Sequence, residues 1–247
     1  MVRSSLFYHN TLTFHGRNQL NTTLWYRPDQ WDDRNSEGNG AYRTEEGGLL
    51  EVAWGTDTSK KLSVSVGANG MTEALGDWSW TAKGGFTWKP NDRFSLDFDV
   101  FYRTTTDWLI HLQDGPIMGA YEAEHWQPSI GMDLFLTARQ QLRFTLQWVG
   151  IDADAAELYR VPDGGGELIQ LTDGITVPDY DFTISRLTTQ LRYRWEIAPL
   201  SDLFIVYTRG SNLPNRYNDE FGDLFHDALT DPVVDRFVIK LRYRFGL

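Results

Sequence analysis

The sequence predicts an all-β protein, an antiparallel up-and-down transmembrane β-barrel with about 11–12 strands. Three observations predict this fold: apolar and polar residues alternate in nearly every candidate strand, tight turns alternate with long polar loops, and aromatic residues are abundant. The 247 residues include ten Trp, eleven Tyr and fourteen Phe, and they include no Cys. No apolar run reaches the roughly 18 residues of a transmembrane helix. Barrels place aromatic residues at both membrane interfaces, and their strands alternate instead of forming apolar runs.

The last segment of the chain shows the alternation most clearly. Every second residue of 237–245 is apolar, and most of the residues between them are basic. A β-strand sends successive side chains to opposite faces, so this segment has one apolar face and one cationic face. In a soluble sheet the apolar face would pack on a core. In an outer-membrane barrel it would contact lipid, and the charged face would line a wet lumen.

The same alternation places the other strands along the chain. The turns between them are rich in Pro, Gly, Asn, Asp and Ser, and no segment shows a helical period. The predicted strands cover approximately 6–14, 20–26, 50–54, 62–68, 78–88, 94–102, 130–136, 142–148, 187–195, 203–207 and 234–245.

Short and long connections alternate between the predicted strands. This is the layout of an up-and-down outer-membrane barrel, with short periplasmic turns and long extracellular loops. The short turns are 16–19, 57–60, 89–92, 137–140 and 198–202, and the longer polar connections are 27–46, 70–77, 104–120, 150–181 and 209–235.

The negative charge of the chain is concentrated in the long connections. The net charge is −11, whereas loops 27–46, 150–181 and 209–235 together carry −14, so the rest of the chain carries +3. An acidic rim could bind cations or steer them toward a pore, but a solvated set of loops is the favoured interpretation. No basic stripe faces outward, which argues against nucleic acid as a partner.

The charged residues opposite the apolar faces are the candidates for a lumen lining. Two interpretations of them remain open. They could create a transverse field that orients polar solutes in a pore, or they could form cross-strand ion pairs that fill a narrow barrel. These candidates are Asp97, Asp99, Asp133, Arg143, Arg186, Arg192, Arg194, Lys240, Arg242 and Arg244.

The sequence carries no recognisable catalytic or cofactor-binding motif. Its five His form no HExxH motif, no Ser lies in a Gly-x-Ser-x-Gly elbow, and the absence of Cys rules out thiolate metal sites. Asp29, Asp32, Asp33 and Glu37 lack the twelve-residue EF-hand pattern, which favours a structured acidic loop over a calcium site. We therefore expect no enzymatic activity, no cofactor and no bound metal.

Four segments of the chain resemble motifs of a bacterial protein family. They are the loop motif Trp31-Asp-Asp-Arg-Asn-Ser-Glu-Gly-Asn-Gly40, the hairpins Trp88–Leu96 and Arg194–Tyr207, and the closing strand Val238–Phe245. In this order they resemble the domain of unknown function that follows a carbohydrate-binding-module-family-9-like domain in large Gram-negative envelope proteins. The resemblance implies an outer-membrane barrel that handles glycans, with no established activity and no catalytic residues.

We expect residues 1–247 to form a single β-barrel domain. Members of the resembled family are longer, and bacterial barrels normally have an even number of strands, whereas eleven are counted here. Either a further strand lies in 150–181, or the chain is the C-terminal part of a larger barrel. An open sheet edge is not tolerated in lipid, which is why one of these must hold.

The predicted function is that of a passive porin-like channel or a surface-exposed envelope protein in the bacterial outer membrane. The expected partners are outer-membrane lipid and lipopolysaccharide, the barrel-insertion machinery, and small polar solutes or glycans, with no nucleic acid among them. Two alternatives are a soluble all-β glycan-binding module and an outer-membrane hydrolase.

Overall fold

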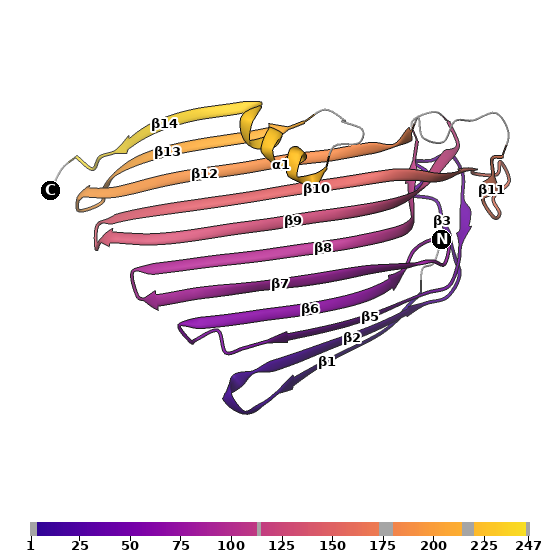
Figure 1. Cartoon of the computed structure of the whole chain (residues 1–247), viewed down its shortest axis with the longest axis horizontal. Helices are drawn as coiled ribbons and strands as arrows, with labels where there is room; N and C mark the ends of the chain where they lie inside the picture. Colours follow the sequence, from indigo (N-terminus) through magenta and orange to yellow (C-terminus); the bar gives the residue numbers. More distant parts are fainter. Residues whose placement is uncertain (1–3, 113–114, 173–179, 214–219, 246–247) are drawn as a thin grey trace.

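The computed structural model describes residues 4–112, 115–172, 180–213 and 220–245, and most of them belong to one antiparallel sheet (Figure 1). Each long strand pairs with the next long strand along the chain, which confirms the predicted all-β, up-and-down topology. The long strands are β1 (Leu6–Thr13), β2 (Gln19–Arg27), β5 (Gly47–Gly55), β6 (Leu62–Thr72), β7 (Trp78–Asn91), β8 (Phe94–His111), β9 (Ile117–Thr137), β10 (Gln140–Arg160), β12 (Phe182–Ala198), β13 (Ser201–Asn212) and β14 (Val234–Arg242).

The connections at the two ends of the sheet differ in length. One end, the short-turn end, carries only connections of two to six residues, one of which contains the 3-10 helix η1 (His15–Arg17). The other end, the long-loop end, carries the long connections 28–46, 161–181 and 213–233. These connections contain the short strands β3 (Gln30–Asp32), β4 (Tyr42–Thr44) and β11 (Ile169–Gln170), and the helix α1 (Phe221–Thr230).

The structure corrects three details of the prediction. The connection expected at 104–120 shrinks to 112–116, because β8 and β9 extend past the apolar part of their sequences. The only strand described within 150–181 apart from the ends of β10 is β11, which has two residues, pairs with β10 and does not extend across the sheet. The expectation of no helix was wrong, because α1 lies in the last long loop. No helix in the described part of the chain is long and apolar enough to cross a membrane.

The sheet is open along both long edges. Among the described residues β1 pairs only with β2 and β14 pairs only with β13. The two edge strands lie at opposite sides of the sheet in Figure 1. The antiparallel ladder is therefore present, whereas the closure expected of a barrel is not found within these residues.

One face of the sheet is apolar and uncovered over most of its area. Val66 in β6 is 51% exposed and Ile239 in β14 is 62% exposed, although both belong to regular strands. Cross-strand register places one apolar residue from each strand on this side, which we call the apolar face. Its members include Tyr8, Leu24, Leu50, Val66, Phe86, Phe98, Ile130, Phe144, Leu191, Tyr207 and Ile239.

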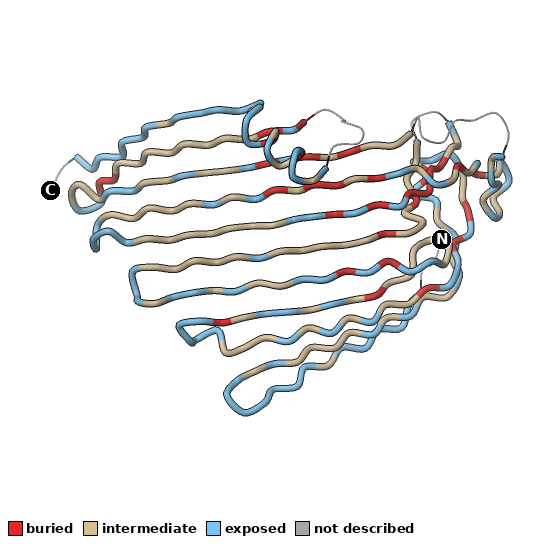
Figure 2. Tube along the Cα trace, viewed as in Figure 1, coloured by how far each residue is buried: buried red, intermediate tan, exposed pale blue. Residues whose placement is uncertain are grey.

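Most buried residues gather at the long-loop end, as the red segments of Figure 2 show. There the loops and strand ends form two apolar clusters. The first contains Tyr42, Leu109, Met118, Ala120 and Val161, and the second contains Tyr121, Ala123, Ile151 and Ala153. Among the described residues one further apolar cluster lies on the sheet itself, around Trp148.

The polarity of the two faces exchanges near the long-loop end. On β9 the apolar face ends at Trp126, which contacts Tyr102 of β8 with ring centroids 4.5 Å apart. The next residues on the same face are Glu124 and Glu122, whereas Ala123 on the opposite face is buried. The apolar band thus has a defined margin, and β8, β9 and β10 continue beyond it.

Helix α1 covers one corner of the apolar face. Phe221, Leu224, Phe225 and Ala228 have the spacing of one helical face, and they pack on β10 and β12 around Trp148. Trp148 Nε1 donates a 3.0 Å hydrogen bond to Ser185 Oγ. Ser185 Oγ in turn donates to the carbonyl oxygen of Leu224 at 2.9 Å. Apolar packing and this polar chain together fix the helix against the sheet.

The docking of α1 can be tested by cysteine labelling, because the chain has no Cys of its own. Leu224 is 1% exposed and Leu229, on the same helix, is 36% exposed. We expect Leu224→Cys to react with a maleimide about tenfold more slowly than Leu229→Cys, since the helix must open before Leu224 is reached. Equal rates in the folded protein would show that α1 is not docked.

Candidate functional site

The polar face of the sheet, opposite the apolar face, carries the charged residues that the sequence singled out. Register places Asp97, Asp99, Asp133, Arg143, Arg186, Arg192, Arg194, Lys240 and Arg242 on this face. Arg244 follows the end of β14, and its backbone N–H donates to Ser201 Oγ at 3.0 Å.

Four of these arginines meet around one pocket near the short-turn end. The pocket has a volume of about 330 Å³ and is formed by the neighbouring strands β10, β12, β13 and β14. We call Arg143, Arg192, Arg194 and Arg242 the arginine cluster. The pocket is lined by these four residues together with Gln141, Asp202 and Phe204.

Asp133 of β9 orients one member of the cluster. Arg143 Nε lies 2.8 Å from Asp133 Oδ1, and Arg143 Nη2 lies 3.0 Å from Asp133 Oδ2. This bidentate geometry is the strongest form of the arginine–carboxylate pair. Gln141 Nε2 also donates to Asp133 Oδ1 at 2.9 Å. The guanidinium of Arg143 is therefore held from the side opposite Arg192.

Asp202, at the start of β13, is shared by two other arginines of the cluster. Its side chain is 1% exposed, and Arg194 Nε donates to Oδ1 at 2.9 Å. Arg242 Nη2 donates to Oδ2, so one carboxylate faces two guanidinium groups. The sequence analysis missed Asp202 because it assigned 198–202 to a turn. The strand register that places it opposite Arg242 is visible only in the structure.

The other predicted residues are not brought into this pocket. Asp97 accepts a hydrogen bond from Thr87 Oγ1 at 2.7 Å, and Arg186 Nε donates to Asn212 Oδ1 at 2.9 Å. Further along the same face, Lys83 Nζ pairs with Glu51 at 2.6 Å. Cross-strand pairs therefore satisfy part of the charged residues on the polar face. In the arginine cluster, by contrast, positive charges outnumber negative ones.

A second pocket adjoins the first at the short-turn end. Its volume is about 440 Å³, and it shares Gln141 and Arg143 with the first pocket. Its additional basic lining residues are Lys60, Lys61, Lys89 and Arg93, and its acidic ones are Asp92 and Asp133. The polar face is thus cationic at the short-turn end, whereas the long loops carry the excess of acids.

The motif Trp31–Gly40 has a structural role in the first long loop. Asp32 Oδ1 accepts hydrogen bonds from the backbone N–H groups of Arg34 and Asn35 at 2.8 and 3.1 Å, which fixes a tight turn. Asn35 Nδ2 then donates to the carbonyl oxygen of Leu109 at 3.0 Å. The motif therefore attaches this loop to the end of β8. Within the described residues no three His, Asp or Glu side chains are placed to hold a metal ion.

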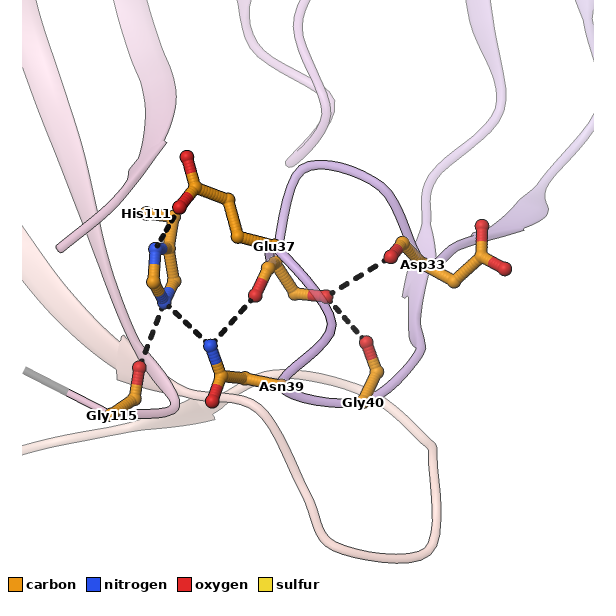
Figure 3. A network of polar contacts seen from close by, with 7 residues as sticks. Asp33, Glu37, Asn39, Gly40, His111 and Gly115 are labelled. Carbon is orange, nitrogen blue, oxygen red and sulfur yellow. Dashed lines mark hydrogen bonds and ion pairs between the residues drawn. The ribbon is translucent and has the colours of Figure 1, made fainter. Parts of the chain in front are cut away.

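A second attachment of the same loop centres on His111, at the end of β8 (Figure 3). His111 Nε2 lies 3.0 Å from Asn39 Nδ2 and 2.8 Å from the carbonyl oxygen of Gly115. Glu37 Oε2 lies 3.6 Å from Nδ1 of the same ring. These contacts tie the first long loop and the connection 112–116 to the end of β8, and they leave the ring surrounded by fixed partners.

Asp107 is a carboxyl group at the long-loop end whose pKa is raised well above its ordinary value. It lies in β8 beyond Tyr102, at a bulge where its φ is 57°. Burial, a hydrogen bond with Asp77 and the negative charge of Glu157 raise the pKa of Asp107 to about 6. The charged form of this carboxyl is thus disfavoured in the folded protein.

Loss of the shared carboxylate should weaken the sheet. Asp202→Asn leaves Arg194 and Arg242 facing each other without their common counter-charge, and we expect a loss of about 1–3 kcal/mol in the free energy of unfolding. Asp99→Asn is the matched control, because Asp99 is exposed on the same face and should change stability by less than about 0.5 kcal/mol. Denaturant unfolding of both variants measures the difference. Equal stabilities would refute the bridging role of Asp202.

The raised pKa of Asp107 predicts a pH dependence of stability. The folded protein binds this proton more tightly than the unfolded chain, so stability should fall as the pH rises from about 4 to about 6 and then level off. Asp107→Asn should remove this component, and Asn tolerates the positive φ of the site. The measurement is the unfolding midpoint of both proteins at several pH values. An unchanged difference between them across this window would contradict the assignment.

Comparison with known proteins identifies a family and no function. No curated protein and no solved structure matches the chain. A family model described as a domain of unknown function, DUF5916, matches residues 2–245. The chain therefore belongs to the DUF5916 family.

Proposed function

We propose that this chain forms part of the wall of a transmembrane β-barrel in the bacterial outer membrane. In this arrangement the apolar face contacts lipid, and the polar face lines a water-filled passage for small polar solutes. The observation that carries the proposal is the uncovered apolar face, which extends over every long strand of the sheet.

The apolar face is costly in water and favourable in lipid. Full burial of one large aliphatic or aromatic side chain is worth about 1.5–3 kcal/mol. Leu62, Val66, Ile239 and Leu241 are all more than half exposed on this face, and similar residues recur on the other strands. A monomeric soluble protein rarely exposes an apolar patch of this extent. Lipid chains around the sheet would supply the burial that the described residues do not.

The dimensions of the apolar band fit a bilayer. On β7 the band extends from Trp78 to Trp88, about eleven residues, which corresponds to roughly 25 Å for a tilted strand. Aromatic pairs lie near both margins. Trp88 contacts Phe94 at 5.6 Å near the short-turn end, and Trp78 stacks on Trp80 at 5.9 Å near the other. Such girdles are typical of membrane interfaces.

The open edges determine what else the proposal requires. Unpaired N–H and C=O groups along β1 and β14 would each be costly in lipid, where no water can satisfy them. We infer that additional strands complete the wall between β14 and β1, so that the barrel is larger than the described sheet. The short turns would then be periplasmic and the acidic long loops extracellular, near lipopolysaccharide, and assembly would require the barrel-insertion machinery.

The proposal can be tested with two adjacent residues of an interior strand. Ser65 and Val66 of β6 are both exposed in the sheet but lie on opposite faces. In lipid vesicles, a water-soluble maleimide should label Ser65→Cys through the wet polar face. It should label Val66→Cys at least about tenfold more slowly, because that side chain contacts lipid.

The same pair distinguishes the competing class of protein. A soluble sheet would leave both positions open to water, so equal labelling of Ser65→Cys and Val66→Cys would overturn the membrane proposal. Labelling after unfolding in hot detergent is the control that both cysteines are reactive. Protection of both positions in vesicles would refute the water-filled passage.

A further inference from the structure

The arginine cluster contains two like charges in directly opposite positions, and only one of them is paired with a carboxylate among the described residues. Arg143 of β10 and Arg192 of β12 are directly opposite each other in the register. Like charges at such positions destabilise a sheet, because the side chains lie about 5 Å apart. Arg143 is paired with Asp133, but Arg192 forms no ion pair or hydrogen bond with any described residue. Arg192 is therefore a cation without a partner among the residues that the structure describes.

Charge counting extends this imbalance to the whole pocket. The four guanidinium groups face one lining carboxylate, that of Asp202, and Asp133 binds Arg143 from outside the pocket. When both carboxylates are subtracted from the four guanidinium charges, a net charge of about +2 remains around the cavity. The neighbouring pocket adds Lys60, Lys61 and Lys89, so the potential stays positive on that side.

We propose that the arginine cluster binds an oxyanion, the carboxylate or phosphate group of a small solute, with Arg192 as the principal contact. Guanidinium groups present planar N–H donors that match both oxyanions. A bound oxyanion would separate the charges of Arg143 and Arg192 and offset their repulsion. The inference goes beyond the proposed passage, because neighbouring strands of the described sheet form this pocket without any need for barrel closure.

The contacts to Asp202 and Asp133 leave the cluster free to bind. Arg143 and Arg194 each use Nε and Nη2 for their carboxylates, and Arg242 uses Nη2. Each guanidinium has five N–H groups, so donors remain for a ligand. The side chains of Arg143, Arg194 and Arg242 are 42%, 47% and 62% exposed, which makes them accessible from the cavity. The two carboxylates thus hold Arg143, Arg194 and Arg242 in place, so that of the four arginines mainly Arg192 would be ordered by binding.

The location of the pocket favours a dissolved anion over a lipid headgroup. All of the lining strands turn these arginines to the polar face, on the opposite side from the apolar face that lipid would contact. Phe204 adds an apolar ring beside the donors, in the same cross-strand row as Gln141 and Arg194. The site therefore suits a small anion with a compact apolar part as well as inorganic phosphate itself.

Calorimetric titration of the full chain, folded in detergent, with inorganic phosphate and with acetate at constant ionic strength tests the site. We expect saturable binding of at least one of them, and Arg192→Gln should lower its affinity about tenfold or more, as expected for lost charge-assisted hydrogen bonds. Arg186→Gln is the matched control on the same strand and face, and it should bind like the wild type. Absence of saturable binding, or an equal loss in both variants, would overturn the proposal.

Thermal unfolding provides a second readout that does not depend on calorimetry. Phosphate should raise the unfolding temperature of the wild type and of Arg186→Gln, but not of Arg192→Gln. Without phosphate, Arg192→Gln should be at least as stable as the wild type, because it removes a like-charge contact.

Arg192-dependent binding of phosphatidylglycerol micelles without any binding of phosphate or acetate would identify a headgroup as the ligand and refute the solute assignment. The binding experiments test the anion site, whereas the labelling of Ser65→Cys and Val66→Cys tests the membrane proposal, so either proposal can fail without the other.

Discussion

In the described part of the chain the sheet has no apolar layer that covers its own apolar face, and the rest of the structure depends on this constraint. In most β-proteins a second sheet or a layer of helices buries such a face. Among the described residues α1 covers only the corner around Trp148, and the other two apolar clusters lie among loops and strand ends at the long-loop end. The backbone ladder satisfies the hydrogen bonds of the interior strands, but it supplies no hydrophobic burial. The described residues therefore bury little of the apolar face themselves.

The exchange of polarity along β9 and β10 indicates two different surroundings. The register between these strands is continuous from Ser129–Gln147 to Ala123–Ala153 apart from one unpaired step around Trp148, and alternation of the faces is kept. The exchange from Trp126 to Glu124 is therefore a property of the sequence and not of a slipped register. On the short-turn side of Trp126 the apolar face is exposed, and in the proposed barrel it would contact lipid. On the long-loop side Glu124 and Glu122 are exposed, and Ala153 on the opposite face is fully buried among residues of β8, β9, β10 and β12. One face of the same sheet is thus apolar over most of its length and acidic near the long-loop end.

Alternation with a period of two predicted the strands that have one apolar face. The sequence did not predict the elements that lack this alternation. Most strands with one apolar face were placed within about five residues of their observed bounds, and their order followed from the short connections. The long-loop ends of β9 and β10 were missed, because β9 begins at Ile117 instead of near 130 and β10 ends at Arg160 instead of near 148. Helix α1 was missed although Phe221, Leu224 and Ala228 have helical spacing, because ten residues inside an acidic loop give a short signal. The extension of β8 to His111 was missed because polarity exchanges there and the pattern breaks.

Of the arginine pocket, the four cations were predicted as residues of one face. Their convergence and the role of Asp202 depend on strand register, which alternation alone does not determine.

The charge of the molecule differs between the two ends of the strands as well as between the two faces of the sheet. This difference would affect how the polar face attracts or repels a solute. The long loops hold the excess of acids, and the arginine cluster with Lys60 and Lys61 lies at the opposite end. In the proposed barrel, a low-dielectric wall of lipid and apolar side chains would limit the screening of this field from outside. An anion on the polar face would then be repelled by the loops and drawn toward the short-turn end. Arg192, which has no carboxylate among the described residues, is the position where this attraction would be strongest.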